Sequence, residues 1–335
     1  MDLRHVRCPG STGQVAGHRA RRQPSRLVPI TGEPVRTPTL GALASTAVLA
    51  LAVTGCGSDD SDTKSTAAGG SGETTAAATV DQAIADQVPA EIKSKGTLKV
   101  GSDPTYAPNE FLDEDGKTII GMDPDLGKAI ADVMGLKVEF EKAGFDAILP
   151  GLASNKYDLG ISSFTDTKER EQEFDFVTYF RAGTSFFVKA EGGPNVTKLT
   201  ELCGHKVAVQ KGTTQQDEAQ AQAKECGSGK LDVQVYPDQN GANQALISGR
   251  ADVGMADSPI AAYQVKQTEG QFKLSGEPYG TAPYGIALPK GSELAPAIQA
   301  ALKKLIENGE YTKILGKWGV ESGAITEPEI NGAES

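Results

Sequence analysis

The sequence predicts an α/β protein built from two similar lobes. Strand and helix signals alternate from residue 89 onward, as in mostly parallel sheets covered by helices. One pattern occurs twice, as L-x-S-N-K-x-D-L-G-I at residues 152–161 and as L-x-S-G-R-x-D-V-G-M at residues 246–255. Each copy predicts a helix end, a turn and a buried strand. A looser second pair of strand-and-turn segments, 98–104 and 207–213, supports the same duplication.

The first 55 residues predict an export signal. Residues 40–53 are apolar, uncharged and 14 in number, which suits the core of a signal peptide and is too short to span a bilayer. The stretch ends in Val53-Thr54-Gly55-Cys56, which resembles the lipobox of bacterial lipoproteins, whose cysteine carries the lipid. The alternative is a buried apolar helix with a chance cysteine.

The segments on both sides of this signal core differ in composition. Residues 1–34 form a segment that is longer, and richer in Arg and Pro, than the charged start of a signal peptide usually is. This suggests the hypothesis that translation begins near Val35. Residues 56–79 are mainly small and polar, and we expect a flexible tether with a reach of about 25–30 Å. The folded part would then be extracytoplasmic, held at the outer face of the cell membrane by a lipid anchor on Cys56.

The composition suits a globular body of about two domains, because 38% of the 335 residues are hydrophobic and 23% are charged. The net charge is −11, and since residues 1–55 carry +5, the remainder carries −16. Such an acidic body argues against a nucleic-acid partner, which needs clustered Lys and Arg. We expect a monomer that uses no cofactor.

Two cysteines, Cys203 and Cys226, lie in the part that is expected to fold. The only histidine there is His205, so a Cys/His zinc site lacks ligands and no metal is expected. An extracytoplasmic compartment permits a disulfide. We favour a structural Cys203–Cys226 bridge, and two free buried thiols are the alternative.

Further elements follow from the apolar pattern. Residues 98–102 and 138–140 predict short strands. Between them, apolar residues at i, i+3, i+4 and i+7 predict a helix within 121–135, with Gly135 just past its end. Residues 292–308 predict an amphipathic helix that packs back on the first lobe.

The ends of the predicted strands indicate where a ligand binds, because ligands of open parallel sheets bind beyond the carboxyl ends of the strands. Residues 162–170 predict a helix start whose hydroxyls and free N–H groups attract an anion, and Arg170 there can grip a carboxylate with two hydrogen bonds. Residues 210–216 predict a second helix start, with a capping box formed by Thr213 and Gln216. For both segments, the alternative is a plain helix start without a ligand.

The opposite charge would come from Asp257, which ends the other duplicated strand and can bind an ammonium group. Its alternative is an Asx turn before Pro259. An Arg on one lobe and an Asp on the other would fit a zwitterion. Tyr106 and Phe145 would offer rings to the side chain of the ligand, and a place in the core is the alternative for each.

These residues resemble the polar amino-acid solute-binding proteins of bacterial ABC importers, the family-3 group. The resemblance covers about residues 89–320. The motifs that carry it are FDAILPGL-x-S-x-KYDLGISSFTDTKER at Phe145–Arg170, DFVTYF at Asp175–Phe180, GMDPDLGKAIA at Gly121–Ala131, VAVQKGTT at Val207–Thr214 and SGRADVGMAD at Ser248–Asp257.

The resemblance implies the type II periplasmic binding protein fold, in which two Rossmann-like lobes are joined by two crossover strands. It places lobe 1 at residues 80–182 and 281–335, and lobe 2 at residues 183–280. The chain would cross between the lobes near residues 183–189 and 281–284. A ligand that bridges the lobes would close the cleft, and the closed form would dock on an ABC transporter permease.

The resemblance also implies a role for each matching residue. Arg170 would clamp the α-carboxylate of a free L-amino acid, helped by Thr165 and the backbone of Thr214. Asp257 would take the α-ammonium group, helped by Ser163. The full set of implied ligand-binding residues is Asp103, Tyr106, Phe145, Ser162, Ser163, Thr165, Arg170, Thr213, Thr214 and Asp257.

The chain departs from the family at Asn109, where the family often has Phe. Asn109 is expected to admit a polar ligand side chain or to face solvent, and Glu110 beside it adds an acid. Asp103 matches a position that contacts the cationic end in binders of basic amino acids, so we expect arginine, lysine, ornithine or glutamine. One alternative is an enzyme of the same fold, a dehydratase with Glu110 as general acid. The sensing lobe of a receptor is another.

Overall fold

The computed structural model describes residues 79–334, which fall within one compact unit of the chain. The predicted export signal, the lipidation site Cys56 and all but the last residue of the predicted tether lie outside this part. Within residues 79–334, no helix combines the length and the apolar character that crossing a membrane requires.

The strands form one large and one small sheet. Within the described residues they are β1 (Thr97–Ser102), β2 (Thr105–Tyr106), β3 (Glu110–Leu112), β4 (Ile119–Ile120), β5 (Lys137–Lys142), β6 (Leu159–Gly160), β7 (Phe174–Lys189), β8 (Lys206–Gln210), β9 (Asp232–Tyr236), β10 (Val253–Asp257) and β11 (Phe272–Pro289). The large sheet has the order β5-β1-β6-β11-β7-β10-β8-β9, and β2-β3-β4 form the small one. In the large sheet, β5-β1-β6 are parallel and so are β10-β8-β9. The long antiparallel strands β7 and β11 join these two sets.

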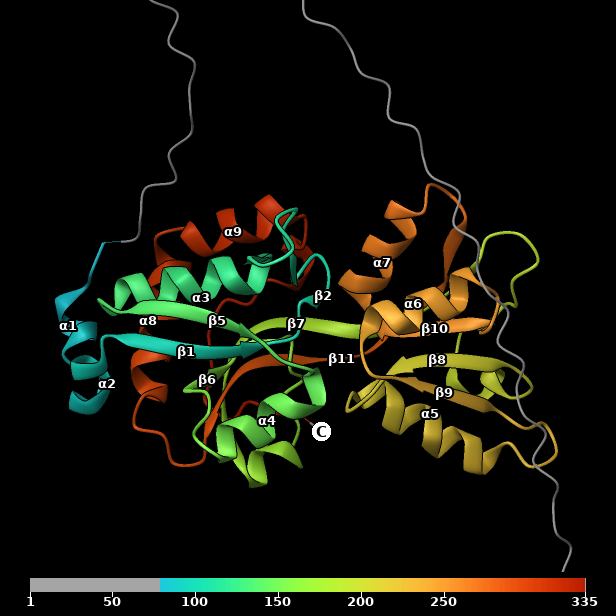
Figure 1. The fold of residues 1–335 in the computed structure, drawn as a ribbon, viewed down its shortest axis with the longest axis horizontal. Coiled ribbons are helices and arrows are strands. Elements are labelled where there is room, and N and C mark those ends of the chain that lie inside the picture. Colours follow the sequence, from blue (N-terminus) through green and yellow to red (C-terminus); the bar gives the residue numbers. More distant parts are fainter. Residues whose placement is uncertain (1–78, 335) are drawn as a thin grey trace, which may run out of the picture. The chain divides into compact units, whose positions relative to one another are not determined.

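Helices cover both sets of parallel strands. They are α1 (Gln82–Ala85), α2 (Ala90–Lys95), α3 (Met122–Val133), α4 (Phe145–Ala153), α5 (Thr214–Glu225), α6 (Gln239–Ile247), α7 (Ser258–Gln267), α8 (Ala295–Glu307) and α9 (Glu310–Trp318), with short 3₁₀ turns η1 (Arg170–Gln172), η2 (Leu199–Leu202) and η3 (Glu321–Gly323). We call β5-β1-β6 with the small sheet β2-β3-β4, η1, α1–α4, α8 and α9 lobe 1, and β10-β8-β9 with η2 and α5–α7 lobe 2. Figure 1 shows α3 and α9 on one face of the lobe 1 strands and α4 on the other, while α6 and α7 lie opposite α5 in lobe 2. The predicted two-lobed α/β fold is confirmed.

The elements predicted from the apolar pattern are present. The predicted strands at 98–102 and 138–140 lie within β1 and β5. The predicted helix at 121–135 is α3, and Gly135 follows it with a φ of +71°. The predicted helix at 292–308 is α8, whose apolar residues belong to the core of lobe 1 together with those of α3. Its packing on the first lobe is confirmed.

The duplicated pattern corresponds to α4–turn–β6 in lobe 1 and α6–turn–β10 in lobe 2. At equivalent places in the two turns, Asn155 has a φ of +57° and Gly249 a φ of +71°. Gly and Asn are the residues that adopt this left-handed conformation at the lowest cost. Both copies of the pattern therefore stop the helix and return the chain to the sheet in the same way.

The two lobes have separate hydrophobic cores. The largest buried cluster lies in lobe 1 and includes Val100, Ile130 and Leu302. The main cluster of lobe 2 surrounds Val207, beside which Cys203 and Cys226 form a disulfide with their Cα atoms 5.4 Å apart. This bond joins the end of η2 to the end of α5.

Candidate ligand-binding site

A cavity lies between the lobes, at the carboxyl ends of the parallel strands. About 290 Å³ of space there, part of it open to solvent, is not filled by protein atoms. Its lining residues are Asp103, Tyr106, Glu110, Phe145, Thr165, Arg170, Gln210, Thr213, Thr214, Gln215 and Asp257. The structure thus brings together eight of the ten residues predicted to bind the ligand. Ser162 and Ser163 do not line the cavity.

Arg170 approaches the cavity from lobe 1, on the turn η1. Its guanidinium donates to the carbonyl oxygens of Thr165 at 2.7 Å and of Gly212 at 3.1 Å. The guanidinium carbon lies 5.8 Å from the ring centre of Phe145 and 5.6 Å from that of Phe164. Burial lowers the pKa of Arg170, but an arginine remains charged in a protein. Since a guanidinium has five N–H groups, it can still donate to an anionic ligand.

The loop of lobe 2 that faces Arg170 ends in a capped helix. Thr213 is the N-cap of α5, and its hydroxyl oxygen accepts from the backbone N–H of Gln216 at 3.2 Å. The side chain of Gln216 accepts in return from the N–H of Gly212 at 2.8 Å. The predicted capping box is therefore present in a modified form. The Gln216 side chain accepts from the N–H of the residue before the N-cap, whereas in the usual box it accepts from the N–H of the N-cap residue itself. The first N–H groups of α5, at Thr214 and Gln215, have no partner within the helix.

Asp257 approaches the cavity from lobe 2, at the end of β10. Its carboxylate accepts from the hydroxyl of Tyr106 at 2.9 Å and from the amide of Gln215 at 2.8 Å. It makes no capping bond to α7, so the Asx turn considered from the sequence is absent. Burial raises the pKa of Asp257, although these hydrogen bonds oppose the shift. Tyr106 belongs to lobe 1, but its ring packs in a cluster of lobe 2 residues.

Asp103 lies at the end of β1 and is only 3% exposed. Its carboxylate accepts from the backbone N–H of Phe145 at 3.1 Å and from the hydroxyl of Thr105 at 2.9 Å. The amide of Gln210, from lobe 2, donates to it at 2.7 Å. Burial raises the pKa of Asp103 despite these bonds. All three of these hydrogen-bond donors are uncharged, so the carboxylate of Asp103 has no cationic partner among its hydrogen bonds.

Ser162 and Ser163 lie directly behind the cavity wall. Their hydroxyls donate to the two carboxylate oxygens of Glu110 at 3.0 Å and 3.1 Å. The N–H of Ser163, whose φ is +52°, donates to Asp123 at 2.9 Å, and Tyr179 donates to the same carboxylate at 2.8 Å. Burial and the nearby charge of Asp123 raise the pKa of Glu110 well above its usual range, and burial raises that of Asp123 to about 6. Burial thus favours the protonated form of Glu110, whose charged form would face the nearby carboxylate of Asp123.

A wider, acidic hollow adjoins the cavity and shares Arg170 and Thr214 with it. Its lining includes four carboxylates, those of Glu169, Glu173, Asp217 and Glu218. These four carboxylates are not arranged to hold a metal ion, and neither is any other group of His, Cys, Asp and Glu among residues 79–334.

Residues 98–321 match the sequence profile of the bacterial extracellular solute-binding proteins, family 3. The chain belongs to this family. It is 37% identical over 252 residues to the arginine-binding protein ArgT of Corynebacterium glutamicum, covering 74% of this chain and 82% of that protein. It also resembles solved structures of an ancestral arginine-binding protein. The arginine-bound form has a TM-score of 0.63 at 41% identity, covering 67% of this chain and 98% of that one, and the glutamine-bound form has 0.63 at 40%, covering 68% and 99%.

Membership of the family-3 solute-binding proteins confirms the type II periplasmic binding protein fold. The relatives are named as amino-acid-binding proteins and not as enzymes, so this chain is a binding protein. The family is extracellular, in agreement with the predicted export.

Two expectations about the site of this solute-binding protein are wrong. No α-helix begins after Ser163, and only the turn η1 forms at Arg170–Gln172. Thr165 instead forms an isolated antiparallel bridge with Tyr284, and Phe164 is buried. Asn109 neither faces solvent nor lines the cavity. It is fully buried, and its amide donates to the hydroxyl of Ser163 at 2.9 Å.

Sequence reasoning missed Gln210 and Gln215 as lining residues. Both flank the Gly212 turn, and each donates to a cavity carboxylate. A signal was available, because Gln210 ends a strand whose carboxyl end was expected to face the ligand. Glu110 is expected from the sequence only as an extra acid or as the general acid of the alternative enzyme, and no pattern indicates that it lies beside Asp123.

Proposed function

We propose that the protein is an extracytoplasmic substrate-binding lipoprotein that captures a polar L-amino acid and delivers it to an ABC transporter permease. One observation carries the proposal, namely that Arg170 from lobe 1 and Asp257 from lobe 2 line the same cavity. An amino acid carries a carboxylate and an ammonium group on one carbon. It therefore satisfies both residues only by bridging the lobes, and this differential affinity would stabilise the closed form.

The proposed contacts divide between the two ends of the zwitterion. Arg170 has guanidinium N–H groups left for the carboxylate, and Thr165 and the free N–H of Thr214 lie in the same lining. Asp257 takes the ammonium group, and Ser163 supports the cavity wall through its hydrogen bond to Glu110. Thr213 contributes by capping α5, and Ser162 by accepting from the N–H of Asp103 at 3.0 Å.

The ligand side chain would lie against Tyr106, Phe145 and Asp103. We propose a basic or amide side chain, and arginine first. Asp103 lines this end of the cavity with a carboxylate, and the carboxylates of the adjoining hollow would attract a cation on its way in. Relatives named for arginine, and an ancestral protein solved with arginine and with glutamine, support the same class.

The remaining parts of the proposal concern the whole chain. A monomer would be anchored by lipid on Cys56 after removal of residues 1–55, with residues 56–79 as tether. Lobe 1 would span 80–182 and 281–335, and lobe 2 would span 183–280. Irregular pairing between β7 and β11, with register shifts from Ser275 to Tyr284, suits a hinge at the second crossing.

A thermal-shift screen of the whole chain tests the proposal. The panel is the twenty amino acids with ornithine and citrulline. A ligand at 100 times its Kd adds about 2.7 kcal/mol of stability, so arginine, lysine, ornithine or glutamine should raise the Tm of the protein clearly. The Arg170→Ala variant should show a much smaller rise at the same ligand concentration. A whole chain that responds to none of these compounds would reject amino-acid binding.

A further inference from the structure

The last residues of the chain lie beyond the family match, which ends at residue 321, and pack on lobe 1. We call residues 324–334 the C-terminal strap. On one side, β7 pairs with β11 along its length, and β10 covers the other side only from Thr184 to Val188. The strap covers part of the edge that remains, since Ile330 forms an antiparallel bridge with Val177.

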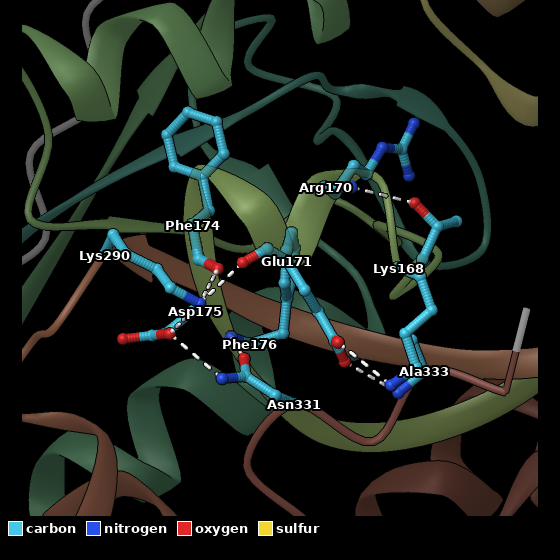
Figure 2. Close-up of polar contacts among 10 residues, drawn as sticks. Lys168, Arg170, Glu171, Phe174, Asp175, Phe176, Lys290, Asn331 and Ala333 are labelled. Atoms are coloured by element: carbon cyan, nitrogen blue, oxygen red, sulfur yellow. Dashed lines mark hydrogen bonds and ion pairs between the residues drawn. The ribbon is translucent and has the colours of Figure 1, made fainter.

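Asn331 fixes the strap on β7. Its φ is +57°, a conformation that Asn tolerates better than most residues. Its side-chain oxygen accepts from the N–H of Phe176 at 2.9 Å, and its amide donates to Asp175 at 3.0 Å. Figure 2 shows Asn331 between these two residues, with Lys290 on the far side of Asp175. The strap is therefore in a defined register on the strand that leaves the Arg170 turn.

The strap also holds the Arg170 turn through Glu171. The N–H of Ala333 donates to one carboxylate oxygen of Glu171 at 2.9 Å, and Lys168 donates to the other at 3.0 Å (Figure 2). Lys290 donates to the backbone carbonyl of Glu171 at 2.6 Å. Glu171 is thus fixed at both its side chain and its backbone, one residue from the guanidinium that lines the cavity.

The end of the strap reaches β7 and β11, the two linking strands that join the lobes. Glu334 accepts two hydrogen bonds from the guanidinium of Arg181, at 2.7 Å and 2.9 Å. The same guanidinium reaches the carbonyl of Thr281, on the second linking strand, at 3.5 Å. Consecutive strap residues, Ala333 and Glu334, therefore contact the Arg170 turn and the linking strands.

We propose that the C-terminal strap is a positioning element of the ligand site, an inference that rests on the proposed function. Ala333 and Glu334 are positioning residues, because they act on the ligand only through the Arg170 turn and the linking strands. A preorganised Arg170 loses less conformational freedom when a carboxylate binds. The strap therefore raises the affinity for the α-carboxylate, which all amino acids share. It does not change the choice between ligand side chains.

The variant Ala333→Pro tests this directly, because proline removes the N–H that donates to Glu171. Ala333→Gly keeps that N–H and is the matched control. Calorimetric titration at 25 °C, with L-arginine and L-glutamine as probes, should give a Kd about 10-fold higher for Ala333→Pro than for the control. The factor should be the same for each probe that binds the whole chain, whereas a purely structural role would lower the Tm and leave the Kd unchanged.

A deletion of residues 333–335 gives a second test if the proline variant does not fold. It removes both strap contacts and leaves Ile325, Pro328 and Ile330 in place, and it should raise the Kd by at least the same factor. Glu327→Gln is its control, because Glu327 pairs with Lys303 on α8, away from the site. Kd values within two-fold of the whole chain in both tests would overturn the strap proposal alone. A whole chain that binds no amino acid would overturn the proposed function and this inference together.

Discussion

The two lobes share one backbone frame and differ in what has been added to it. In lobe 1, the carboxylate of Asp158 accepts from the N–H of Lys99 at 2.7 Å. In lobe 2, Asp252 accepts from the N–H of Lys206 at 2.9 Å. Both aspartates occupy the same place in the duplicated pattern and cap the neighbouring parallel strand. The repeated residues therefore build the frame.

The proposed ligand chemistry lies in residues that are not repeated. Lobe 1 supplies Arg170 and the buried acids, and the C-terminal strap closes its exposed strand edge. Lobe 2 supplies Asp257 and the start of α5, and a disulfide ties the other end of that helix. Each lobe therefore has its own stabilising feature, the strap in lobe 1 and the disulfide in lobe 2, while the cavity depends on residues from both lobes.

Loss of the Arg170 guanidinium should have the largest effect on ligand affinity. Arg170→Ala leaves the proposed carboxylate without its charged partner, which typically costs about 2–5 kcal/mol, or roughly 30- to 4,000-fold in Kd. Calorimetric titration with L-arginine measures it. Arg250→Ala, which removes an exposed arginine of lobe 2, is the control and should bind as the whole chain does.

Removal of the disulfide should weaken lobe 2 without weakening binding at 25 °C. The bond closes a loop with a sequence separation of 23 residues, and chain entropy assigns such a loop about 3 kcal/mol. The double variant Cys203→Ser/Cys226→Ser should therefore unfold at lower denaturant concentration. Since the bond lies at the far end of α5 from Thr214, a large rise in Kd for L-arginine would contradict the separation of frame and site.

Lobe 1 should carry a pH-dependent weakness at Asp166. Burial, and then the charge of Glu171, raises its pKa to about 7 from an ordinary value of 3.8. The folded state therefore binds a proton that the unfolded state has lost between about pH 4 and pH 7, so stability falls as the pH rises through that range.

Asp166→Asn keeps a neutral side chain at every pH. It should be more stable than the whole chain by about 2 kcal/mol at pH 8, with the difference shrinking towards pH 4. Denaturant unfolding at the two pH values measures it. A difference that stays constant with pH would show that Asp166 is ionised in the folded protein.

The repeated aspartates should give the smallest effects, and similar ones. Asp158→Ala and Asp252→Ala each remove one acceptor from a strand N–H, which should cost about 1.5 kcal/mol of unfolding free energy. Asp158 also pairs with Lys95, so the two losses should agree to within about 1 kcal/mol. Parallel urea unfolding of the two variants checks it. If only one variant were destabilised, the two copies of the pattern would not have the same structural role.

The sequence was sufficient to predict the fold because the duplicated pattern and the helix at α3 are local signals. It also placed Arg170, Thr213 and Asp257 at strand and helix ends that share one cavity. It failed for residues 162–169, because tertiary pairing of Thr165 with Tyr284 outweighs the local helix-start signal. It could not place Asn109, because a buried amide is recognised only from its partner Ser163, which is distant in sequence.

The central claim is that one ligand bridges the lobes through its carboxylate at Arg170 and its ammonium group at Asp257. Calorimetric titration of the whole chain with L-arginine, agmatine and 5-guanidinovaleric acid tests it most directly, because the last two lack the carboxylate and the α-ammonium group in turn. We expect L-arginine to bind and each analogue to lose at least 100-fold in affinity. Agmatine or 5-guanidinovaleric acid binding as tightly as L-arginine would contradict it.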